Sequence, residues 1–570
     1  MKGLKLDRNG SEYSVDALRY GLRIDADRAR ADVVISGTTV ARLDMRSAVN
    51  SLTAANEVVT DTEPELPVFE GAVEQGELCV FTWRGKTALW SKKYTLSCTA
   101  QRFAYNVSVS GRGRVDSVNY FSGDITALYK GSGYEFSEGF NPCRSWFEEE
   151  NYYFKANQSC YRWSVLMIPP MHCYAFRTEG LHEWLGLGAV ARRGEHNFNS
   201  LTYNFCGADW HSAFYLSTDQ HGHTHVDGEW VSPAIIGYAA NDELDVMRRY
   251  SDYYFSSGIA RPKKRELTPR FWKGPLLCGW IDQCRREING RTGSELACEE
   301  EYEYLLGQMR KYDLHPTALI IDDKWQREYA TGEVDTEKWP DLRAFVDKRH
   351  AEGINTLLWF KLWDPEGWPR ELCVTADNGD VRIDPSTPEF KAHIERLMHT
   401  LLSSDEGCYN CDGVKIDFAF YFPIGRGFTT RSGRYGCELL YELMAHIYDC
   451  AKRVKPNALI NCSPCHPYFS HICDQARVHD YAAGNRCNYE DLAMRARMFA
   501  LAMPGTLIDT DNAGFASRRD TMRWMLNQQD IGVPDCYCLT PHGEITDDDF
   551  YAISAVWKEY SARIDREYAD

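Results

Sequence analysis

The pattern of apolar and polar positions changes its character near residue 240. Before this point, short runs of alternating apolar and polar residues recur between turn residues, and helical periodicity is scarce. Alternation with a period of two is typical of strands with one buried face, so the pattern predicts an N-terminal antiparallel β-sandwich. The clearest of these runs are Val33–Ser36, Leu78–Trp83, Ala104–Val109, Val165–Ile168 and Ala213–Leu216.

A short helical connection follows the predicted sandwich. Asn241–Phe255 places four large side chains on one helical face, namely Leu244, Met247, Tyr250 and Tyr254. Residues 256–268 contain Gly and Pro, which indicates a linker. We therefore expect three parts: a β-sandwich over residues 1–240, a helical linker over 241–269 and a barrel over 270–570.

After residue 270 short buried apolar runs alternate with amphipathic stretches, and this unit recurs eight times. Eight consecutive βα units favour one closed (β/α)8 TIM barrel, typically about 250 residues long, over an open doubly wound sheet. The predicted strands are Leu276–Trp280, Ala318–Asp322, Thr356–Phe360, Gly413–Phe418, Ala458–Cys462, Ala476–Asp480, Thr506–Asp509 and Val533–Leu539. The predicted helices include Glu300–Tyr312, Leu342–Glu352, Pro388–Leu402, Tyr435–Lys452, Tyr489–Leu501, Arg518–Gln529 and Asp547–Tyr560.

Polar side chains gather where these strands end, which is where such barrels carry their active sites. Placing a ring of carboxylates at the mouth of an apolar barrel costs folding free energy, so such a ring indicates a functional site. Two tasks fit: cutting a glycosidic bond with paired carboxylates, or holding a hard cation such as Mg²⁺. The 16 Trp, 33 Tyr and 25 Phe favour a sugar site, since sugar rings pack on aromatic faces. The strand-end residues are Trp280, Asp322, Asp323, Trp359, Lys361, Lys415, Asp417, Asn461, Cys462, Arg477, Asp480, Asp509, Asp511 and Asp535.

Five segments carry a resemblance to a known group of enzymes. They are IIDDKWQ (320–326), LLWFKLW (357–363), VRIDPSTPEF (381–390), GVKIDFAF (413–420) and ARVHDY (476–481). Together they resemble the motif series of the clan D glycoside hydrolases, and most of all family 36, the α-galactosidases and raffinose-synthase-like proteins. Members of that family also carry an N-terminal β-sandwich before the barrel. The resemblance covers residues 270–540 and implies an exo-α-glycosidase that retains the anomeric configuration.

The resemblance also implies roles for single residues. Asp417 would be the nucleophile and Asp480 the acid/base, with carboxyls about 5–5.5 Å apart in a retaining enzyme. Asp322 and Asp323 would accept hydrogen bonds from the hydroxyls at C4 and C6. Lys415 lies two residues before Asp417, so it points to the same face of the strand. It would bind a sugar hydroxyl of the substrate and keep Asp417 ionised. The other implied substrate-binding residues are Trp280, Trp359, Lys361, Cys462 and Arg477.

The strand-five region departs from the family pattern, because NCSPCHPYF lacks the usual glycines after Cys462. The glycone therefore stays open between galactose, glucose, xylose, N-acetylgalactosamine and a sugar acid. Transglycosylation is a second possible activity, since the same residues would serve it. A sugar-binding protein without catalysis is the alternative from another class, and a metal-dependent barrel enzyme is a third. We expect no cofactor and no catalytic metal.

Two groups of His and Cys residues have alternative interpretations. Residues 462–473 hold Cys462, Cys465, His466, His471 and Cys473, but the spacing is unlike a compact zinc site, so ordinary thiols are favoured. Residues 211–225 hold His211, His221, His223 and His225, and the last three would share one face of a strand. That segment is interpreted as a solvated loop, as a segment reaching over the barrel mouth with Asp209 and Trp210, or as a metal site.

The amino-acid composition limits the classes of binding partner and the location that we expect. The 64 basic and 82 acidic residues give a net charge of −18, which excludes a general nucleic-acid binder. The start MKGLKLDRNG has no apolar signal region. The sequence also contains no run of 18 apolar residues, so we expect no membrane-spanning helix. We therefore expect a cytoplasmic protein whose 20 Cys are mostly reduced and whose partner is a small oligosaccharide or glycoside. Assembly into a homo-oligomer stays open.

Overall fold

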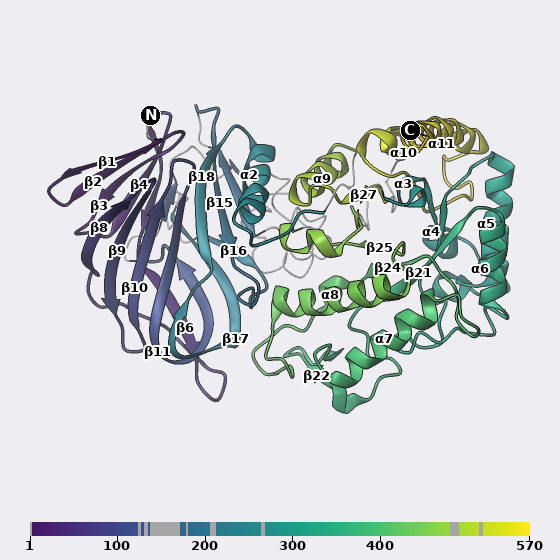
Figure 1. Ribbon diagram of the computed structural model, residues 1–570, viewed down its shortest axis with the longest axis horizontal. Coiled ribbons are helices and arrows are strands. Elements are labelled where there is room, and N and C mark those ends of the chain that lie inside the picture. Colours follow the sequence, from purple (N-terminus) through teal and green to yellow (C-terminus); the bar gives the residue numbers. More distant parts are fainter. Residues whose placement is uncertain are drawn as a thin grey trace.

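The computed structural model contains a β-rich N-terminal part and an α/β C-terminal part, which lie side by side (Figure 1). It describes residues 3–123, 127–129, 135–136, 172–177, 180–205, 213–263, 268–464, 466–478, 489–511 and 517–569. Among the described residues, no helix is both long and apolar enough to cross a membrane.

The N-terminal part is built from antiparallel strands, as the alternating runs predicted. Burial alternates residue by residue along strands such as β4 and β10, so one face of each packs inward. The predicted run Val165–Ile168 lies outside the described residues. The strands are β1 (Leu4–Asn9), β2 (Glu12–Ala17), β3 (Gly21–Asp25), β4 (Arg30–Ile35), β5 (Thr38–Asp44), β6 (Ser47–Leu52), β7 (Val58–Val59), β8 (Val68–Gln75), β9 (Leu78–Lys86), β10 (Ser91–Cys98), β11 (Phe103–Tyr120), β12 (Ala127–Tyr129), β13 (Glu135–Phe136), β14 (Cys173–Arg177), β15 (Trp184–Val190), β16 (Leu201–Phe205), β17 (Ala213–Val231) and β18 (Ala234–Ala240).

The long strands β11 and β17 organise this part. They pair along most of their length, and β11 also pairs with β6 and β10. The pairing register between them shifts where His221 and Gly222 both have positive φ, 47° and 81°. This bulge breaks the period of two, so His223 is buried while His225 is exposed. The prediction that His221, His223 and His225 share one face is therefore wrong.

The C-terminal part is a (β/α)8 barrel, which confirms the predicted fold class. Its parallel strands follow the order β27-β26-β25-β24-β21-β20-β19-β28, and a bridge between Asp509 and Val533 closes the ring. Each strand falls within or beside a predicted segment, although β19 stops before Trp280, which begins a helix. The strands are β19 (Leu276–Cys278), β20 (Ala318–Ile321), β21 (Asn355–Lys361), β24 (Gly413–Asp417), β25 (Leu459–Cys462), β26 (Gln475–Arg477), β27 (Leu507–Asp509) and β28 (Asp535–Cys536), with a separate hairpin of β22 (Cys373–Thr375) and β23 (Val381–Ile383).

Helices surround the barrel, and their ends carry recognisable caps (Figure 1). Thr387 caps the helix that begins with Pro388, and Thr546 forms a capping box with Asp549. The helix after the sandwich packs on β15 and β18 and also contacts α9 of the barrel. The helices are α2 (Glu243–Ser256), α3 (Arg270–Lys273), α4 (Trp280–Arg285), α5 (Glu299–Tyr312), α6 (Leu342–Ala351), α7 (Pro388–Leu402), α8 (Gly436–Val454), α9 (Tyr489–Ala502), α10 (Arg518–Ile531) and α11 (Asp547–Glu567).

The barrel strands divide their side chains strictly between two layers. Alternate residues such as Leu277, Ile460 and Ile508 belong to the large core under the helices. The residues between them point into the barrel, where an apolar layer includes Leu276, Ala318, Leu357, Leu459 and Val533. One step further along the strands the inward positions are polar, so the apolar layer forms a floor beneath a polar mouth.

The sandwich holds the barrel segment that follows β24. Arg426 makes two hydrogen bonds to Asp116 of β11, at 2.8 and 3.1 Å. His223 of β17 donates to the Gly425 carbonyl at 2.7 Å and stacks on Tyr435 with ring centroids 4.0 Å apart. Of the three interpretations of the His211–His225 segment, these contacts agree with the one in which it reaches from the sandwich to the barrel, whereas Asp209, Trp210 and His211 lie outside the described residues.

Candidate active site

Asp417 ends β24 and lies buried at the polar mouth. Its Oδ1 accepts hydrogen bonds from Arg477 at 2.8 Å and from the Phe418 backbone N–H at 2.8 Å. Its Oδ2 accepts one from the indole N–H of Trp359 at 3.1 Å. A carboxylate that accepts several such bonds is favoured in its ionised form and held in one orientation. These are properties that a nucleophilic carboxylate needs.

Arg477 links Asp417 to a second acidic residue. Its side chain is fully buried, and it donates to Asp511 at 3.0 Å and to Ser463 at 3.1 Å as well as to Asp417. A buried guanidinium is stable only with carboxylate partners, and two of them lie among the described residues. The prediction that Arg477 lines the sugar site stays a prediction, and the structure adds that Arg477 orients the predicted nucleophile.

Lys415 pairs with Asp322 rather than with Asp417. Its Nζ donates to Asp322 at 2.6 Å and lies 3.5 Å from the Cys278 sulfur, whose thiol donates to the same carboxylate at 3.0 Å. Burial is the largest single influence and would lower the pKa of Lys415, but the neighbouring groups, first Asp322 and then Cys278, together outweigh it and hold the pKa well above the ordinary value. The pair is nearly inaccessible to solvent, so Lys415 stays charged and fixes Asp322 in place.

Asp323 differs from Asp322 in its exposure and in its hydrogen-bond partners. It is half-buried and accepts a hydrogen bond from the Tyr329 hydroxyl at 2.9 Å. Burial, with the charges of Asp322 and Asp417 as smaller causes, raises the pKa of Asp323 to about 6. Lys361 lies near, with its ammonium 4.1 Å from the centre of the Tyr329 ring and 2.8 Å from Asp364. Asp322 already accepts from Lys415, Cys278 and a backbone N–H, so Asp323 is the better acceptor for a substrate hydroxyl.

A cavity opens beside these groups. It has a volume of about 290 Å³ and is lined by Lys361, Trp363, Asp364, Arg382 and Tyr421, among others. Lys361 is the register partner of Asp417 in the sheet, which places the cavity next to the predicted nucleophile.

The backbone around the mouth is strained at several strand ends. Four non-glycine residues just beyond barrel strands have positive φ: Lys324 (77°), Trp363 (69°), Phe418 (58°) and Asp511 (34°). Such conformations cost of order 1–3 kcal/mol each and persist where the surrounding fold requires them, often at functional sites. At Phe418 the turn directs the backbone N–H back to the Asp417 carboxylate.

Trp280 begins α4 just beyond β19 and packs against the inward-facing barrel cluster that includes Cys278 and Tyr537, so its place in the sugar site stays a prediction. Another predicted site residue lies elsewhere than expected. Cys462 points away from the barrel interior and lies in the outer core with Cys473, so its prediction as a substrate-binding residue is wrong. The reason is the strand period: Asn461 takes the inward position and donates to Asp509 at 2.6 Å, which turns Cys462 outward. Asp480, the predicted acid/base, lies outside the described residues.

Some residues of the mouth had no role in the sequence interpretation. Cys278 and Tyr329 hold Asp322 and Asp323, and Asp535 is buried at the end of the barrel ring. Burial, then the charges of Asp509 and Asp511, raise the pKa of Asp535 well above its usual range. The alternation of side chains along each strand could have identified Cys278 and Asp535 as inward-facing. Tyr329 lies in a loop, where no such pattern exists.

The predicted cysteine and histidine cluster of residues 462–473 does not assemble among the described residues. Cys462 contacts Cys473, His466 bonds to the Tyr250 hydroxyl at 3.2 Å, and His471 bonds to Tyr441 at 2.8 Å. Cys465 lies outside the described residues. The favoured interpretation of these side chains as ordinary core groups therefore agrees with their contacts, except that His466 joins another group described below.

Known proteins match this chain in structure rather than in sequence. No family model matches the sequence, and no curated protein matches it. A GH31 family sulfoquinovosidase from E. rectale aligns over 98% of this chain and 83% of its own, with 12% identity and a TM-score of 0.59. The GH36 α-galactosidase AgaB from Geobacillus stearothermophilus aligns over 98% and 86%, with 11% identity and a TM-score of 0.53. A variant of the GH36 α-galactosidase AgaA from the same organism, in complex with raffinose, gives 12% identity, the same coverage and a TM-score of 0.53. The β-sandwich and (β/α)8 barrel of this chain are therefore the architecture of glycoside hydrolase families 31 and 36, the clan that its strand-end motifs resemble.

Proposed function

We propose that this protein is a retaining exo-α-glycosidase that acts on small α-glycosides through a glycosyl–Asp417 intermediate. The observation that carries the proposal is the setting of Asp417, which is buried at the end of a barrel strand and receives hydrogen bonds from Trp359, Arg477 and a backbone N–H. A carboxylate so oriented is suited to attack an anomeric carbon. The shared fold with glycosidases of families 31 and 36 supports the same reaction class.

The reaction proceeds in two displacements. An oxygen of Asp417 attacks the anomeric carbon as the bond to the leaving oxygen breaks, and Asp480 donates a proton to that oxygen. Water then loses a proton to Asp480 and attacks the same carbon, which releases Asp417 and restores the α configuration. The assignment of Asp480 rests on its place in the ARVHDY segment.

The charges at the mouth favour a neutral glycone. Lys415 faces Asp322, Lys361 faces Asp364, and Arg477 faces Asp417 and Asp511, so each of these cations already has a carboxylate partner. An anionic sugar would have to compete with these partners. Asp323 is the side chain that we assign to a substrate hydroxyl. Galactose is our first choice of glycone, because the matched structures include two α-galactosidases.

Reduced cysteines favour a reducing compartment such as the cytoplasm. No disulfide joins any of the fifteen cysteines that the structure describes. In that setting, small imported oligosaccharides or glycosides are the substrates we propose. Fractionation of native cells against a cytoplasmic marker enzyme tests this location, and recovery of the protein outside the cell would contradict it.

A proton NMR time course tests the activity. The panel consists of the aryl α-glycosides of galactose, glucose, xylose, N-acetylgalactosamine and a uronic acid. We expect one neutral member to be hydrolysed with the α-anomer appearing first. A first product of β configuration would overturn the role of Asp417. Saturable binding with no turnover on any member would instead support a sugar-binding protein, and glycosyl transfer to added sugar acceptors in preference to water would identify a transglycosidase.

A further inference from the structure

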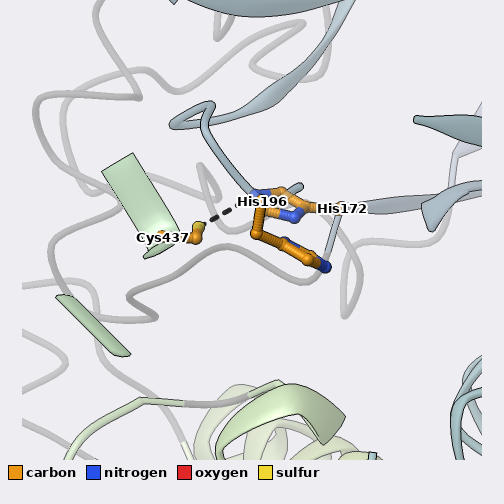
Figure 2. Close-up of side chains that lie close together, drawn as sticks. All are labelled: His172, His196 and Cys437. Carbon is orange, nitrogen blue, oxygen red and sulfur yellow. Dashed lines mark hydrogen bonds between the residues drawn. The ribbon is translucent and has the colours of Figure 1, made fainter. Parts of the chain in front are cut away.

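Two histidines and a cysteine converge where the sandwich meets the barrel (Figure 2). His172 precedes β14, His196 lies between β15 and β16, and Cys437 is the second residue of α8. All three are buried, with 2%, 0% and 1% of their surfaces exposed. Each offers a ligand atom that lies within 4.8 Å of the other two, and the Cys437 sulfur lies 3.8 Å from His172 Nε2.

Aromatic neighbours explain why these side chains are buried, but they provide no hydrogen bond to two of the ring nitrogens. His196 stacks on Tyr468 with centroids 4.5 Å apart, and His172 lies 4.9 Å from Phe198. Yet neither His172 Nδ1 nor His196 Nδ1 has a hydrogen-bond partner among the described residues. A buried polar atom without a partner costs about 1–3 kcal/mol, so two in one group call for a partner other than the residues that the structure describes.

The chemistry of the group matches a transition-metal ion. His172 Nε2 donates to the Asn199 carbonyl at 3.2 Å, and His196 Nε2 lies 3.2 Å from the Tyr254 hydroxyl, so the Nδ1 atom of each ring is the one that can bind a metal ion. Thiolate and imidazole together are the ligands preferred by Zn²⁺.

We propose that His172, His196 and Cys437 bind one Zn²⁺ ion, which fastens the sandwich to the start of α8. On binding, the Cys437 thiol loses its proton to solvent, and the thiolate and one nitrogen of each imidazole donate electron pairs to the metal. His466 stands beside the group, with its ring centre 5.2 Å from that of His172 and 5.6 Å from that of His196, but its two nitrogens already bond to the Tyr468 backbone N–H and the Tyr250 hydroxyl. The site is structural, and it does not depend on the proposed glycosidase activity.

A second group, with two of its three residues on the same helix, provides a matched control. Glu395, His446 and Cys450 also offer ligand atoms within 4.8 Å of one another. There, however, Arg453 lies 3.1 Å from the Cys450 sulfur. A cation in contact with the sulfur opposes a metal ion, and the group lies partly exposed on the surface.

Metal analysis of the full-length protein tests the proposal. The protein is dialysed against buffered Zn²⁺ and then metal-free buffer, and zinc is measured by mass spectrometry. We expect about one zinc per chain in the wild type and in Cys450→Ala, and at least a tenfold lower content in Cys437→Ala. A wild type that retains no zinc, or a folded Cys437→Ala that retains as much as the wild type, would overturn the proposal.

Cobalt substitution covers the case in which Cys437→Ala does not fold. Co²⁺ exchanged into the wild type should give visible d–d bands and a near-ultraviolet band from thiolate-to-metal charge transfer, unchanged in Cys450→Ala. Bound Co²⁺ without the charge-transfer band would exclude Cys437 as a ligand and overturn the proposed ligand set.

Discussion

The barrel mouth and the His172–His196–Cys437 group are both buried and polar, but they differ in how their polar groups find partners. At the mouth, Lys415 and Arg477 carry charge, and each lies within 3.0 Å of a carboxylate. In the histidine–cysteine group, burial keeps the imidazoles neutral and two nitrogens have no described partner. The chain thus compensates its own charges where it must hold a reactive carboxylate, and it leaves electron pairs available where we infer a metal.

The difference follows from how each region is assembled. The mouth is built from neighbouring parallel strands, whose register places Lys361 beside Asp417 and Arg477 beside Asp509. The histidine–cysteine group joins two loops of the sandwich to the start of α8 in the barrel. Regular strands can be paired with opposite charges position by position, whereas a junction of loops and a helix start depends on how the parts dock.

The largest expected effect at the mouth comes from Asp417→Gly. Loss of the nucleophile should lower kcat by at least about 10⁴-fold while the fold persists. Sodium azide should restore turnover and give the β-glycosyl azide, since azide can enter the space left by the carboxylate and attack the same face. Steady-state kinetics and product NMR measure both effects.

A matched control for that variant is Asp364→Asn, which alters a carboxylate of the mouth that pairs with Lys361. We expect it to change kcat by less than about tenfold. Azide-independent turnover by Asp417→Gly near the wild-type rate would contradict the nucleophile assignment.

Removing the positive charge of Lys415 should lower the stability of the fold. Lys415→Met leaves the buried Asp322 without its cation, and we expect the free energy of unfolding to fall by about 3–5 kcal/mol. Urea unfolding measures the change. Lys361→Met, which breaks the more accessible pair with Asp364, should cost about 1 kcal/mol or less. Equal losses in the two variants would show that burial does not distinguish these pairs.

Asp323 should give the mouth a pH dependence. Its pKa is raised to about 6, so the folded protein holds a proton that the unfolded chain has released. Between about pH 4 and pH 6 the free energy of unfolding should therefore decrease as the pH rises, by up to about 1.4 kcal/mol per pH unit from this residue. Above pH 6 its contribution is constant. Urea unfolding across this range, compared with Asp323→Asn, isolates the effect, and identical slopes would contradict it.

The smallest expected effect is that of Trp359→Phe. This change keeps an aromatic ring but removes the hydrogen bond from the indole to Asp417. A hydrogen bond to a charged group contributes about 1.5–3 kcal/mol, so we expect kcat to fall about tenfold with little change in KM. A rise in KM with kcat unchanged would show that Trp359 serves substrate binding instead.

Much of this architecture was readable from sequence because its signals are local. Alternation with a period of two marks each barrel strand, and the inward positions at the strand ends include Asp322, Trp359, Lys415, Asp417 and Arg477. The failures have local causes too. Cys462 was assigned inward although Asn461 occupies that position, and the bulge at His221 and Gly222 broke the alternation on which the shared histidine face depended.

The sequence by itself determined the order of strands and helices, the closed barrel and the polar residues that end its strands, because these depend on neighbours a few positions apart. Only the tertiary structure decided that Lys415 pairs with Asp322, that Arg477 holds Asp417, and that His172 and His196 meet Cys437. Those contacts depend on the stagger of the barrel strands and on the docking of the sandwich against α8. Side chains far apart in the chain become neighbours through packing, which no local pattern records.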